Sequence, residues 1–322
     1  MFFRRAFGGF ALGLLGAAVL LLSALPAGAD TAVSTCQTLS AAGNYFLTKN
    51  LTATGTCITV ASEGVLLDMK GHTITGNGTG DAISDGGVGF ESMAIANGKI
   101  RNFSVGIGLD HSCCVAIRNV DSSMNTGTGI IVGDCCGLID SVTANNNGTV
   151  GIMALSCCYV LNNLQVNNNG TGGGIVATNC CSTISNSTIS HNGGIGVFGN
   201  DCCNFVVNSK VQSNHGHGVE LTTDCCNFVV GSTVAFNTGD GVHLTDDDNL
   251  VTGTNASANG GDGINLSGTD NQITRSQAKG NGGFGANVEC PGAITGLNAK
   301  GGNSGGSLNT TGGTCTTLNN TL

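Results

Sequence analysis

Short blocks of hydrophobic residues recur along the chain, and within each block apolar positions alternate with others. Many blocks begin with a glycine, as in Gly129–Val132, Gly218–Leu221 and Gly241–Leu244. Alternation with a period of two is typical of a β-strand, and no segment shows the 3.6-residue period of an amphipathic helix. The pattern therefore predicts an all-β protein built from many short strands.

The blocks belong to a repeat of 22 or 23 residues. One asparagine marks the same point of every repeat, at positions 102, 125, 147, 169, 192, 214, 237, 259 and 281. Three short strands and three turns in about 22 residues form one coil of a parallel β-helix, each coil lying about 4.8 Å above the last. We therefore expect eight regular coils in a single-stranded solenoid. The asparagine is expected at a sharp corner in left-handed geometry, bonded to its equivalents in the coils above and below.

Adjacent cysteines keep the same spacing as the asparagines. The pairs are Cys113–Cys114, Cys135–Cys136, Cys157–Cys158, Cys180–Cys181, Cys202–Cys203 and Cys225–Cys226. Asp247-Asp248 and Thr269-Asp270 replace the pair in later repeats, so the cysteines do not define the fold. In an extended chain one thiol column would face inward and the other outward. Disulfides between successive coils or thiol packing is the preferred interpretation, with copper(I) or zinc binding and vicinal disulfides as alternatives.

The N-terminus predicts export. Arg4 and Arg5 precede an apolar run and the small residues that end at Ala29, so residues 1–29 read as a secretory signal peptide, with an uncleaved anchor as the alternative. The chain has 20 acidic and 11 basic residues, a net charge of −9, and two of the basic residues lie in this segment. So acidic a surface argues against nucleic-acid partners. We expect no membrane span after cleavage, a monomer, and a periplasmic, extracellular or cell-surface location.

Both ends of a β-helix need protection, because open coils expose sheet edges and core. The prediction places an N-terminal cap at residues 30–57, the β-helix at 58–289 and a C-terminal cap or tail at 290–322. Cys36 pairs with Cys57 and Cys290 with Cys315 in this scheme, since an exported protein favours disulfides.

The chain resembles the right-handed β-helix repeat proteins of the pectin-lyase-like superfamily. Leu66–Gly76 is similar to the first coil of that group, and Gly241–Asn259 and Gly263–Asn281 to its standard repeat, with the likeness running from Ile58 to Val288. The resemblance implies a right-handed helix and makes a polysaccharide the expected ligand. It does not specify an activity, because this architecture carries many.

Side chains of successive coils are expected to align on the outer face. The second residue after each glycine gives the row Gly108, Ile131, Met153, Val176, Glu220, His243, Asn265 and Asn287, with Gly196 falling between. The residue before the glycine adds His217, Asp240 and Asp262. A carboxylate beside an imidazole can perform general acid–base catalysis, so Glu220, His243, His217, Asp240 and Asp262 are the candidate catalytic residues. Solvated surface residues are the alternative.

Two catalytic signatures of the resembling enzymes are incomplete. Gly216–Gly218 matches the Gly-His-Gly of polygalacturonase-like enzymes, but no Arg-x-Lys follows. Asp247, Asp248 and Asp270 could supply a calcium site as in pectate lyases, yet Arg275 and Lys279 are the only cations nearby. No cofactor is required, with calcium, copper or zinc as options.

Aromatic platforms for sugars are scarce, since the chain has no Trp and only Tyr45 and Tyr159 as tyrosines. The apolar outward row Ile131, Met153 and Val176 suggests a covered stripe, or a register slip that turns it inward. We therefore expect a rigid structural or ligand-binding scaffold, polysaccharide being the favoured ligand. The alternatives are a polysaccharide lyase or glycoside hydrolase, and a periplasmic copper- or zinc-binding protein using the cysteines.

Overall fold

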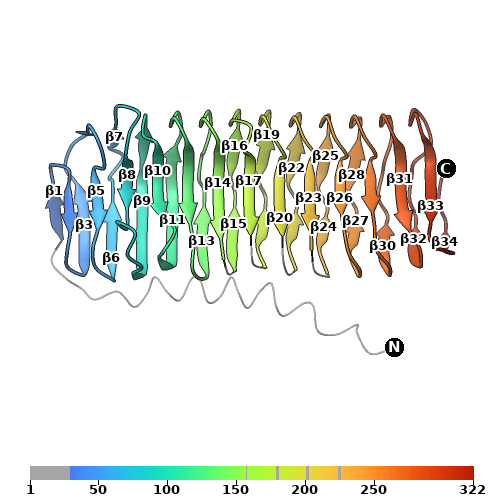
Figure 1. Cartoon of the computed structure of the whole chain (residues 1–322), viewed down its shortest axis with the longest axis horizontal. Helices are drawn as coiled ribbons and strands as arrows, with labels where there is room; N and C mark the ends of the chain where they lie inside the picture. Colours follow the sequence, from blue (N-terminus) through green and yellow to red (C-terminus); the bar gives the residue numbers. More distant parts are fainter. Residues whose placement is uncertain (1–29, 157, 179–180, 201–202, 224–225) are drawn as a thin grey trace.

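The computed structural model describes residues 30–322 except 157, 179–180, 201–202 and 224–225. The chain winds into one elongated solenoid, in which every named strand pairs in parallel with the equivalent strand of a neighbouring coil (Figure 1). No helix occurs among the described residues, and none of them forms a helix able to cross a membrane. The predicted right-handed parallel β-helix is confirmed. The predicted signal peptide, residues 1–29, lies outside the described part.

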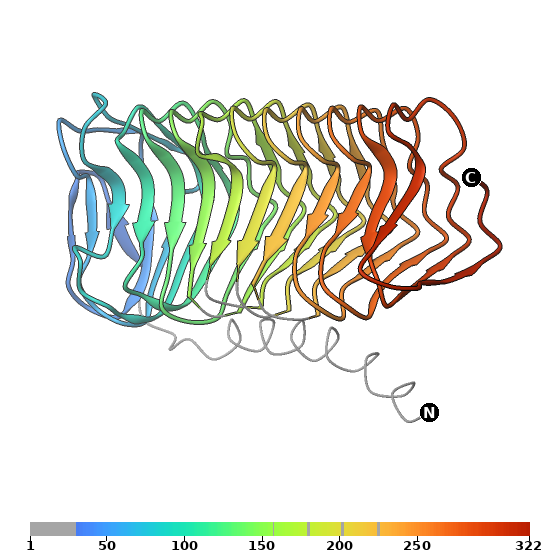
Figure 2. The ribbon, with the colours of Figure 1, turned by 45° about the vertical axis from the view of Figure 1, so that its right-hand side comes forward.

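Three sheets form the solenoid: two run along its whole length, and a third, 5-stranded sheet lies in its middle coils (Figure 2). The 13-stranded sheet, which carries the candidate site, consists of β2 (Gln37–Leu39), β5 (Ile58–Val60), β8 (Asp81–Ser84), β10 (Val105–Leu109), β12 (Thr128–Val132), β14 (Val150–Leu155), β17 (Gly173–Thr178), β20 (Val197–Asn200), β23 (Val219–Thr222), β26 (Val242–Leu244), β29 (Ile264–Leu266), β31 (Phe284–Glu289) and β33 (Gly306–Thr311).

The 16-stranded sheet consists of β1 (Thr31–Val33), β3 (Gly43–Leu47), β4 (Leu51–Thr52), β6 (Val65–Asp68), β7 (Thr73–Thr75), β9 (Glu91–Arg101), β11 (Cys113–Ser122), β13 (Gly137–Asp140), β15 (Tyr159–Asn162), β18 (Thr183–Ser185), β21 (Phe205–Val207), β24 (Phe228–Val230), β27 (Leu250–Thr252), β30 (Asn271–Thr274), β32 (Gly292–Thr295) and β34 (Thr316–Leu318). The 5-stranded sheet consists of β16 (Gln165–Asn167), β19 (Thr188–Ser190), β22 (Lys210–Gln212), β25 (Thr233–Ala235) and β28 (Asn255–Ser257).

The solenoid is longer than the eight coils expected from the asparagines. One sheet alone has 13 strands, and the segments expected as caps contribute strands to it, β2 at the N-terminal end and β33 at the C-terminal end. Disulfides Cys36–Cys57 and Cys290–Cys315 join successive coils there, with Cα–Cα distances of 4.5 and 5.1 Å. These pairings are the ones expected from the sequence.

The core is a column of aliphatic side chains inside the solenoid. Alternate residues of each strand point into it, and Val219, Leu221, Val242 and Leu244 are fully buried. Their neighbours in the sequence point outward because side chains of a strand alternate between its faces. Burial of the inward column explains why the apolar alternation repeats in coil after coil.

Buried asparagines form a continuous ladder at one corner, running through residues 125, 147, 169, 192, 214, 237, 259, 281 and 303. In each step the Nδ2 of one asparagine donates to the Oδ1 of the next, as from Asn192 to Asn214 at 2.9 Å. Asn102 has the expected left-handed backbone, with φ 60°, but its expected place in the ladder is wrong, since Asn102 is exposed and the Phe103 N–H donates to Asn125 Oδ1 instead.

Left-handed backbone at this corner belongs to the residue before each ladder asparagine, for example Asn168 and Phe236. The expectation that the ladder asparagine itself is left-handed is therefore wrong. The ladder also explains the glycine that opens the strands. A Cβ on Gly241 would lie 2.5 Å from Asn259 Nδ2 and 2.6 Å from the Gly263 carbonyl oxygen, so no other residue fits there.

Candidate functional site

One row of outward side chains runs along the 13-stranded sheet. Strand pairing places Glu220 beside His243, and His243 beside Asn265. The row predicted from the sequence thus has the register that the structure shows. In order along the axis it reads Gly108, Ile131, Met153, Val176, Phe198, Glu220, His243, Asn265, Asn287 and Asn309.

The residue predicted between Val176 and Glu220 in the row has to be corrected. This position belongs to Phe198, and not to Gly196, which is buried at the start of the strand. The same rule of counting two residues from the glycine, applied to Gly196, finds Phe198. The extra glycines of Gly193–Gly196 obscured this alignment.

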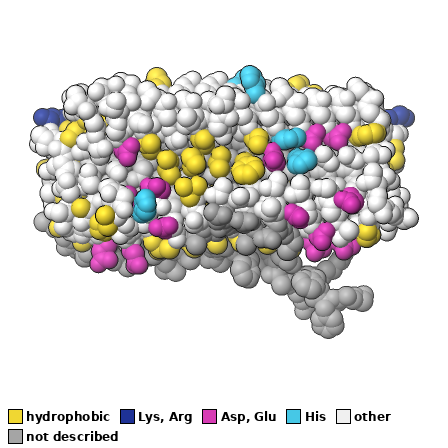
Figure 3. Space-filling model, viewed as in Figure 1, with side chains coloured by type: hydrophobic (Ala, Val, Ile, Leu, Met, Phe, Trp, Pro, Cys, Tyr) yellow, Lys and Arg dark blue, Asp and Glu magenta, His cyan; other side chains and the backbone are white. Residues whose placement is uncertain are grey.

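The outward row has an apolar half and a polar half. Ile131, Met153, Val176 and Phe198 form the apolar half, and each is half-buried. The predicted outward stripe is therefore present, and the register slip that would turn it inward does not occur. Figure 3 shows hydrophobic side chains gathered in the middle of one face, with histidine and acidic side chains beside them toward the C-terminal end.

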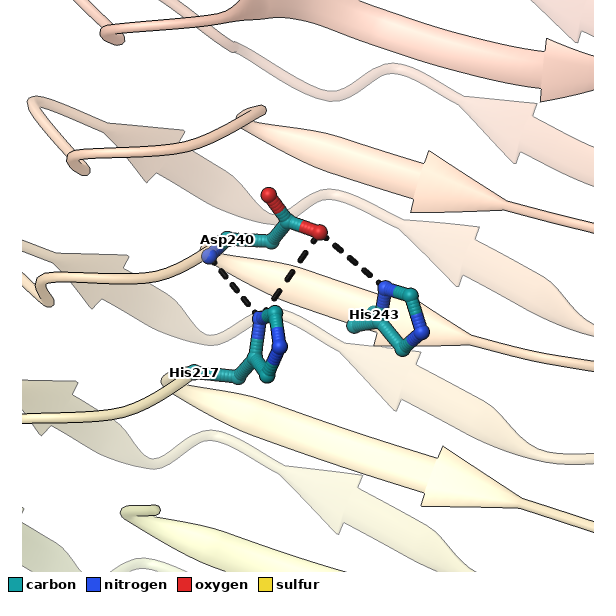
Figure 4. A group of neighbouring side chains, drawn as sticks. All are labelled: His217, Asp240 and His243. Carbon is teal, nitrogen blue, oxygen red and sulfur yellow. Dashed lines mark hydrogen bonds and ion pairs between the residues drawn. The ribbon is translucent and has the colours of Figure 1, made fainter. Parts of the chain in front are cut away.

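Asp240 joins two histidines at the start of the polar half (Figure 4). His243 lies in β26, three residues after Asp240, and its Nδ1 is 3.0 Å from Asp240 Oδ2. His217 occupies the same position as Asp240 one coil earlier, and its Nδ1 is 3.7 Å from the same oxygen. The backbone N–H of Asp240 donates to His217 Nδ1 at 2.9 Å. The two rings stack with centroids 4.8 Å apart.

The surroundings of Asp240 keep it ionised. Burial alone would raise its pKa, but the hydrogen bonds from His243, from Asn265 Nδ2 at 2.9 Å and from the Asp262 amide at 2.7 Å together lower it below 3.8. The hydrogen bond to Asp240 raises the pKa of His243 above its ordinary 6.5, against the opposing effect of burial. An anionic carboxylate thus orients an imidazole that gains protons readily.

Asp262 and Glu220 are the other two acidic residues close to Asp240 and His243. Burial raises the pKa of Asp262, although the Phe284 amide donates to its Oδ1 at 2.6 Å. Glu220 lies next to His243 in the row. The five predicted catalytic residues therefore lie on three successive coils of one face. The central position of Asp240 follows from its side-chain conformation, which the repeat pattern does not reveal.

The predicted calcium ligands do not come together. Asp247, Asp248 and Asp270 are exposed, and the Asp247 carboxylate accepts hydrogen bonds from Thr269 N and Oγ1. Strand β30 separates Asp270 from Arg275, so the acid and the cation lie at opposite ends of a strand. Within the described residues, the groups close enough to hold a metal ion are His217–Asp240–His243 and Asp85–Asp110–His111.

Two cysteine pairs are fully described: Cys113 and Cys114 begin β11, and Cys135 and Cys136 directly precede β13. Cys113 and Cys135 form a disulfide between successive coils, with a Cα–Cα distance of 4.6 Å, and both are half-buried. The expected inward column of thiols is therefore wrong for these two pairs. The cause is local, because Cys114 has a left-handed backbone, which breaks the strict alternation.

The two cysteines beside this disulfide, Cys114 and Cys136, are thiols. Burial raises the pKa of Cys114, which disfavours the thiolate that a soft metal needs. Cys113 and Cys135 cannot bind a metal as thiolates, because they form a disulfide. Cys157, Cys180, Cys202 and Cys225 lie outside the described residues.

Neither tyrosine offers a sugar platform on this face. Tyr159 is buried and donates its hydroxyl to the Gly133 carbonyl at 2.8 Å, while the Tyr45 hydroxyl donates to the Ala41 carbonyl. Phe198 is therefore the aromatic side chain of the described outward row. On the 16-stranded sheet, Phe205 and Phe228 stack with centroids 4.8 Å apart.

Comparison with known proteins supports the fold. A family model described as a right handed beta helix region matches residues 173–322. The periplasmic alginate epimerase AlgG is similar with a TM-score of 0.63 at 14% identity, over 82% of this chain and 76% of AlgG. The A-module of the mannuronan C-5 epimerase AlgE4 from Azotobacter vinelandii has a TM-score of 0.58 at 16% identity, over 87% of this chain and 86% of the module.

The Dettilon tailspike protein is a third similar structure. Its TM-score is 0.60 at 14% identity, over 83% of this chain and 62% of the tailspike chain. No curated protein matches the chain by sequence. At such identities the likeness shows the fold alone. The right-handed β-helix architecture that the resemblance implies is thus confirmed.

Proposed function

We propose that this protein is an exported glycan-binding scaffold that holds a polysaccharide against the outward row of the 13-stranded sheet. The observation that carries the proposal is the junction at which Phe198, Glu220 and His243 lie side by side in register. The apolar face of a sugar ring packs on an aromatic side chain, and a carboxylate and an imidazole beside it can bind sugar hydroxyls.

The charge of the face favours a neutral glycan. Glu220, Asp240 and Asp262 lie at the junction, whereas the described outward row holds no Lys or Arg. An anionic polysaccharide would meet these three carboxylates with no Lys or Arg in the row to offset them. This preference differs from the substrates named for two similar folds, an alginate epimerase and a mannuronan epimerase. What the proposal shares with these two epimerases is a β-helix that acts on or binds a polysaccharide.

Export fits the chemistry of the described cysteines. The disulfides at both ends and the bridge between Cys113 and Cys135 persist in an oxidising compartment such as the periplasm or the extracellular space. A stapled rod of stacked coils is a rigid support for an extended polymer. We propose that it acts as a monomer, because one face of one copy already presents the complete junction.

Binding to a panel of neutral and acidic polysaccharides tests the proposal. Affinity electrophoresis should show retardation by at least one neutral glucan or mannan. Phe198→Ala should weaken binding about tenfold, equal to about 1.4 kcal/mol, by removing the stacking surface. Phe236→Ala is the matched control, because Phe236 is 64% exposed at a corner away from the row. Binding to no panel member, or equal loss in both variants, would refute the proposal.

Acid–base catalysis on a glycan is the second candidate, favoured by the hydrogen bond between Asp240 and His243. The raised pKa of His243 suits a general acid at neutral pH, and a carboxylate partner fixes the orientation of its ring. Product analysis by NMR after long incubation with each bound glycan separates the two functions. If the protein is an enzyme, the wild type should form product and His243→Gln should form none. His191→Gln should still form product, because His191 is an exposed histidine outside the outward row.

A further inference from the structure

We infer that His217, Asp240 and His243 form a binding site for one divalent transition-metal ion such as zinc. The three side chains converge from two successive coils, His217 from one and Asp240 and His243 from the next. The inference does not depend on glycan binding, because it concerns the protein and the ion alone.

The distances between the donor atoms suit one ion. Ligand atoms about 2.0–2.2 Å from a tetrahedral zinc ion lie about 3.3 Å from each other. Asp240 Oδ2 is 3.0 Å from His243 Nδ1 and 3.7 Å from His217 Nδ1, values that bracket this separation. One ligand atom from each of the three residues lies within 4.8 Å of the others. Small side-chain rotations are enough to bring all three onto one ion.

The chemistry of the donors selects the class of metal. Two imidazole nitrogens and one carboxylate oxygen suit zinc, cobalt, nickel and copper, whereas calcium and magnesium prefer oxygen donors. Three protein ligands leave a fourth position for water. The side chains of His217, Asp240 and His243 are 31%, 13% and 26% exposed, so water and an ion can reach them from solvent.

Hydrogen bonds and charges around Asp240 prepare it for this role. Its Oδ1 accepts the Asp262 amide at 2.7 Å, which fixes the carboxylate as outer hydrogen bonds do in metal sites. Asp262 and Glu220 add negative charge nearby, which favours a cation. Figure 4 shows the rings of His217 and His243 on the same side of the carboxylate.

Existing hydrogen bonds oppose the ion at each donor atom. Asn265 Nδ2 lies 2.9 Å from Asp240 Oδ2 and 3.2 Å from His243 Nδ1, so this amide has to turn away when the ion binds. The Asp240 N–H donates to His217 Nδ1, so binding through this nitrogen leaves the amide without that partner. The penalty predicts a weaker affinity than that of a structural four-ligand zinc site, and it makes His217 the ligand with the smallest contribution.

Metal titration of the purified protein is the test. The protein is first stripped with a chelator, and its thiols are alkylated so that Cys114 and Cys136 cannot bind metal. Zinc is then titrated by calorimetry, and cobalt by its visible absorption. We expect one ion per chain and a rise in Tm with zinc, since the ion binds the folded state. Asp240→Asn and His243→Ala should each weaken zinc binding at least tenfold.

His215→Ala is the matched control, because His215 is exposed in the same coil, two residues before His217, and should leave zinc binding unchanged. Circular dichroism without metal checks that each variant is folded. The inference is wrong if the alkylated protein binds neither ion, or if Asp240→Asn and His243→Ala are both folded and bind zinc as tightly as the wild type.

Discussion

The two halves of the outward row share a backbone and differ in chemistry. Met153 and Val176 pair in the apolar half in the same way that Glu220 and His243 pair in the polar half. Inward neighbours are aliphatic and fully buried in both halves, for instance Ile152 and Leu244. The comparison teaches that the core determines the coil, whereas the outward position is free to carry a function because the fold does not depend on its side chain.

The largest effect should come from inward positions, equally in both halves. Ile152→Ala and Leu244→Ala each remove a fully buried aliphatic side chain and should lower the free energy of unfolding by about 2–5 kcal/mol. The outward change Met153→Ala should lower it by less than about 1 kcal/mol. Urea unfolding measures all three. If Met153→Ala lowered the free energy of unfolding as much as Ile152→Ala, the claim that outward side chains do not determine the fold would be wrong.

The asparagine ladder should contribute equally to the free energy of unfolding in the two halves. Asn169 and Asn237 each accept two hydrogen bonds on Oδ1 and donate two from Nδ2, at distances between 2.9 and 3.2 Å. Replacing either by Ala strands buried donors of the preceding coil, so each variant should lose about 1–3 kcal/mol of unfolding free energy. Exposed Asn102, outside the ladder, provides the control. Unequal losses at 169 and 237 would show that the halves differ beyond their outward residues.

The smallest effect is a dependence on pH confined to the polar half. Because the folded pKa of His243 is raised, its stabilising effect is complete below about pH 6.5 and is lost as the pH rises through the folded value. The lowered pKa of Asp240 makes its contribution present above about pH 3.8 and lost in stronger acid. His243→Gln should therefore lose more stability at pH 6 than at pH 9, by less than about 1 kcal/mol.

Urea unfolding of the wild type and His243→Gln at the two pH values measures this difference, and an NMR titration of the His243 ring follows its protonation directly. Val176→Ala, in the apolar half, should show the same loss at both pH values. A His243→Gln variant with a larger loss at pH 9 would reverse the sign and contradict the pairing with Asp240.

Much of the fold was predictable because the inward residues repeat. Every coil has to bury the same column, so the glycine and the alternate apolar residues recur, and counting from the glycine places Glu220 beside His243. The bridge from Asp240 to both histidines depends on side-chain rotation, which repetition does not constrain. The half-buried position of the Cys113–Cys135 disulfide was also hidden, because the left-handed residue Cys114 interrupts the alternation on which the prediction relied.

A second ladder was missed for a different reason. Asn204, Asn227, Asn249 and Asn271 follow the cysteine pairs and the acids that replace them, and each backbone N–H donates to the side chain of the next. The sequence signal was the asparagine directly after the last two cysteine pairs and after the two residue pairs that replace them, Asp247-Asp248 and Thr269-Asp270. The asparagines continue as Asn249 and Asn271 in the two repeats that lack the cysteine pair, so this row does not depend on the cysteines.

The asparagine ladder gives the rod a direction of its own. From Asn125 to Asn281, each side-chain amide donates one hydrogen to the asparagine of the next coil toward the C-terminal end, and hydrogen bonds in such a series strengthen one another. The series ends at Asn303, whose Nδ2 donates to the carbonyls of Ala278 and Ala299 instead of to another asparagine. The ladder therefore has two unlike ends: along the series Asn125 only donates, and Asn303 only accepts.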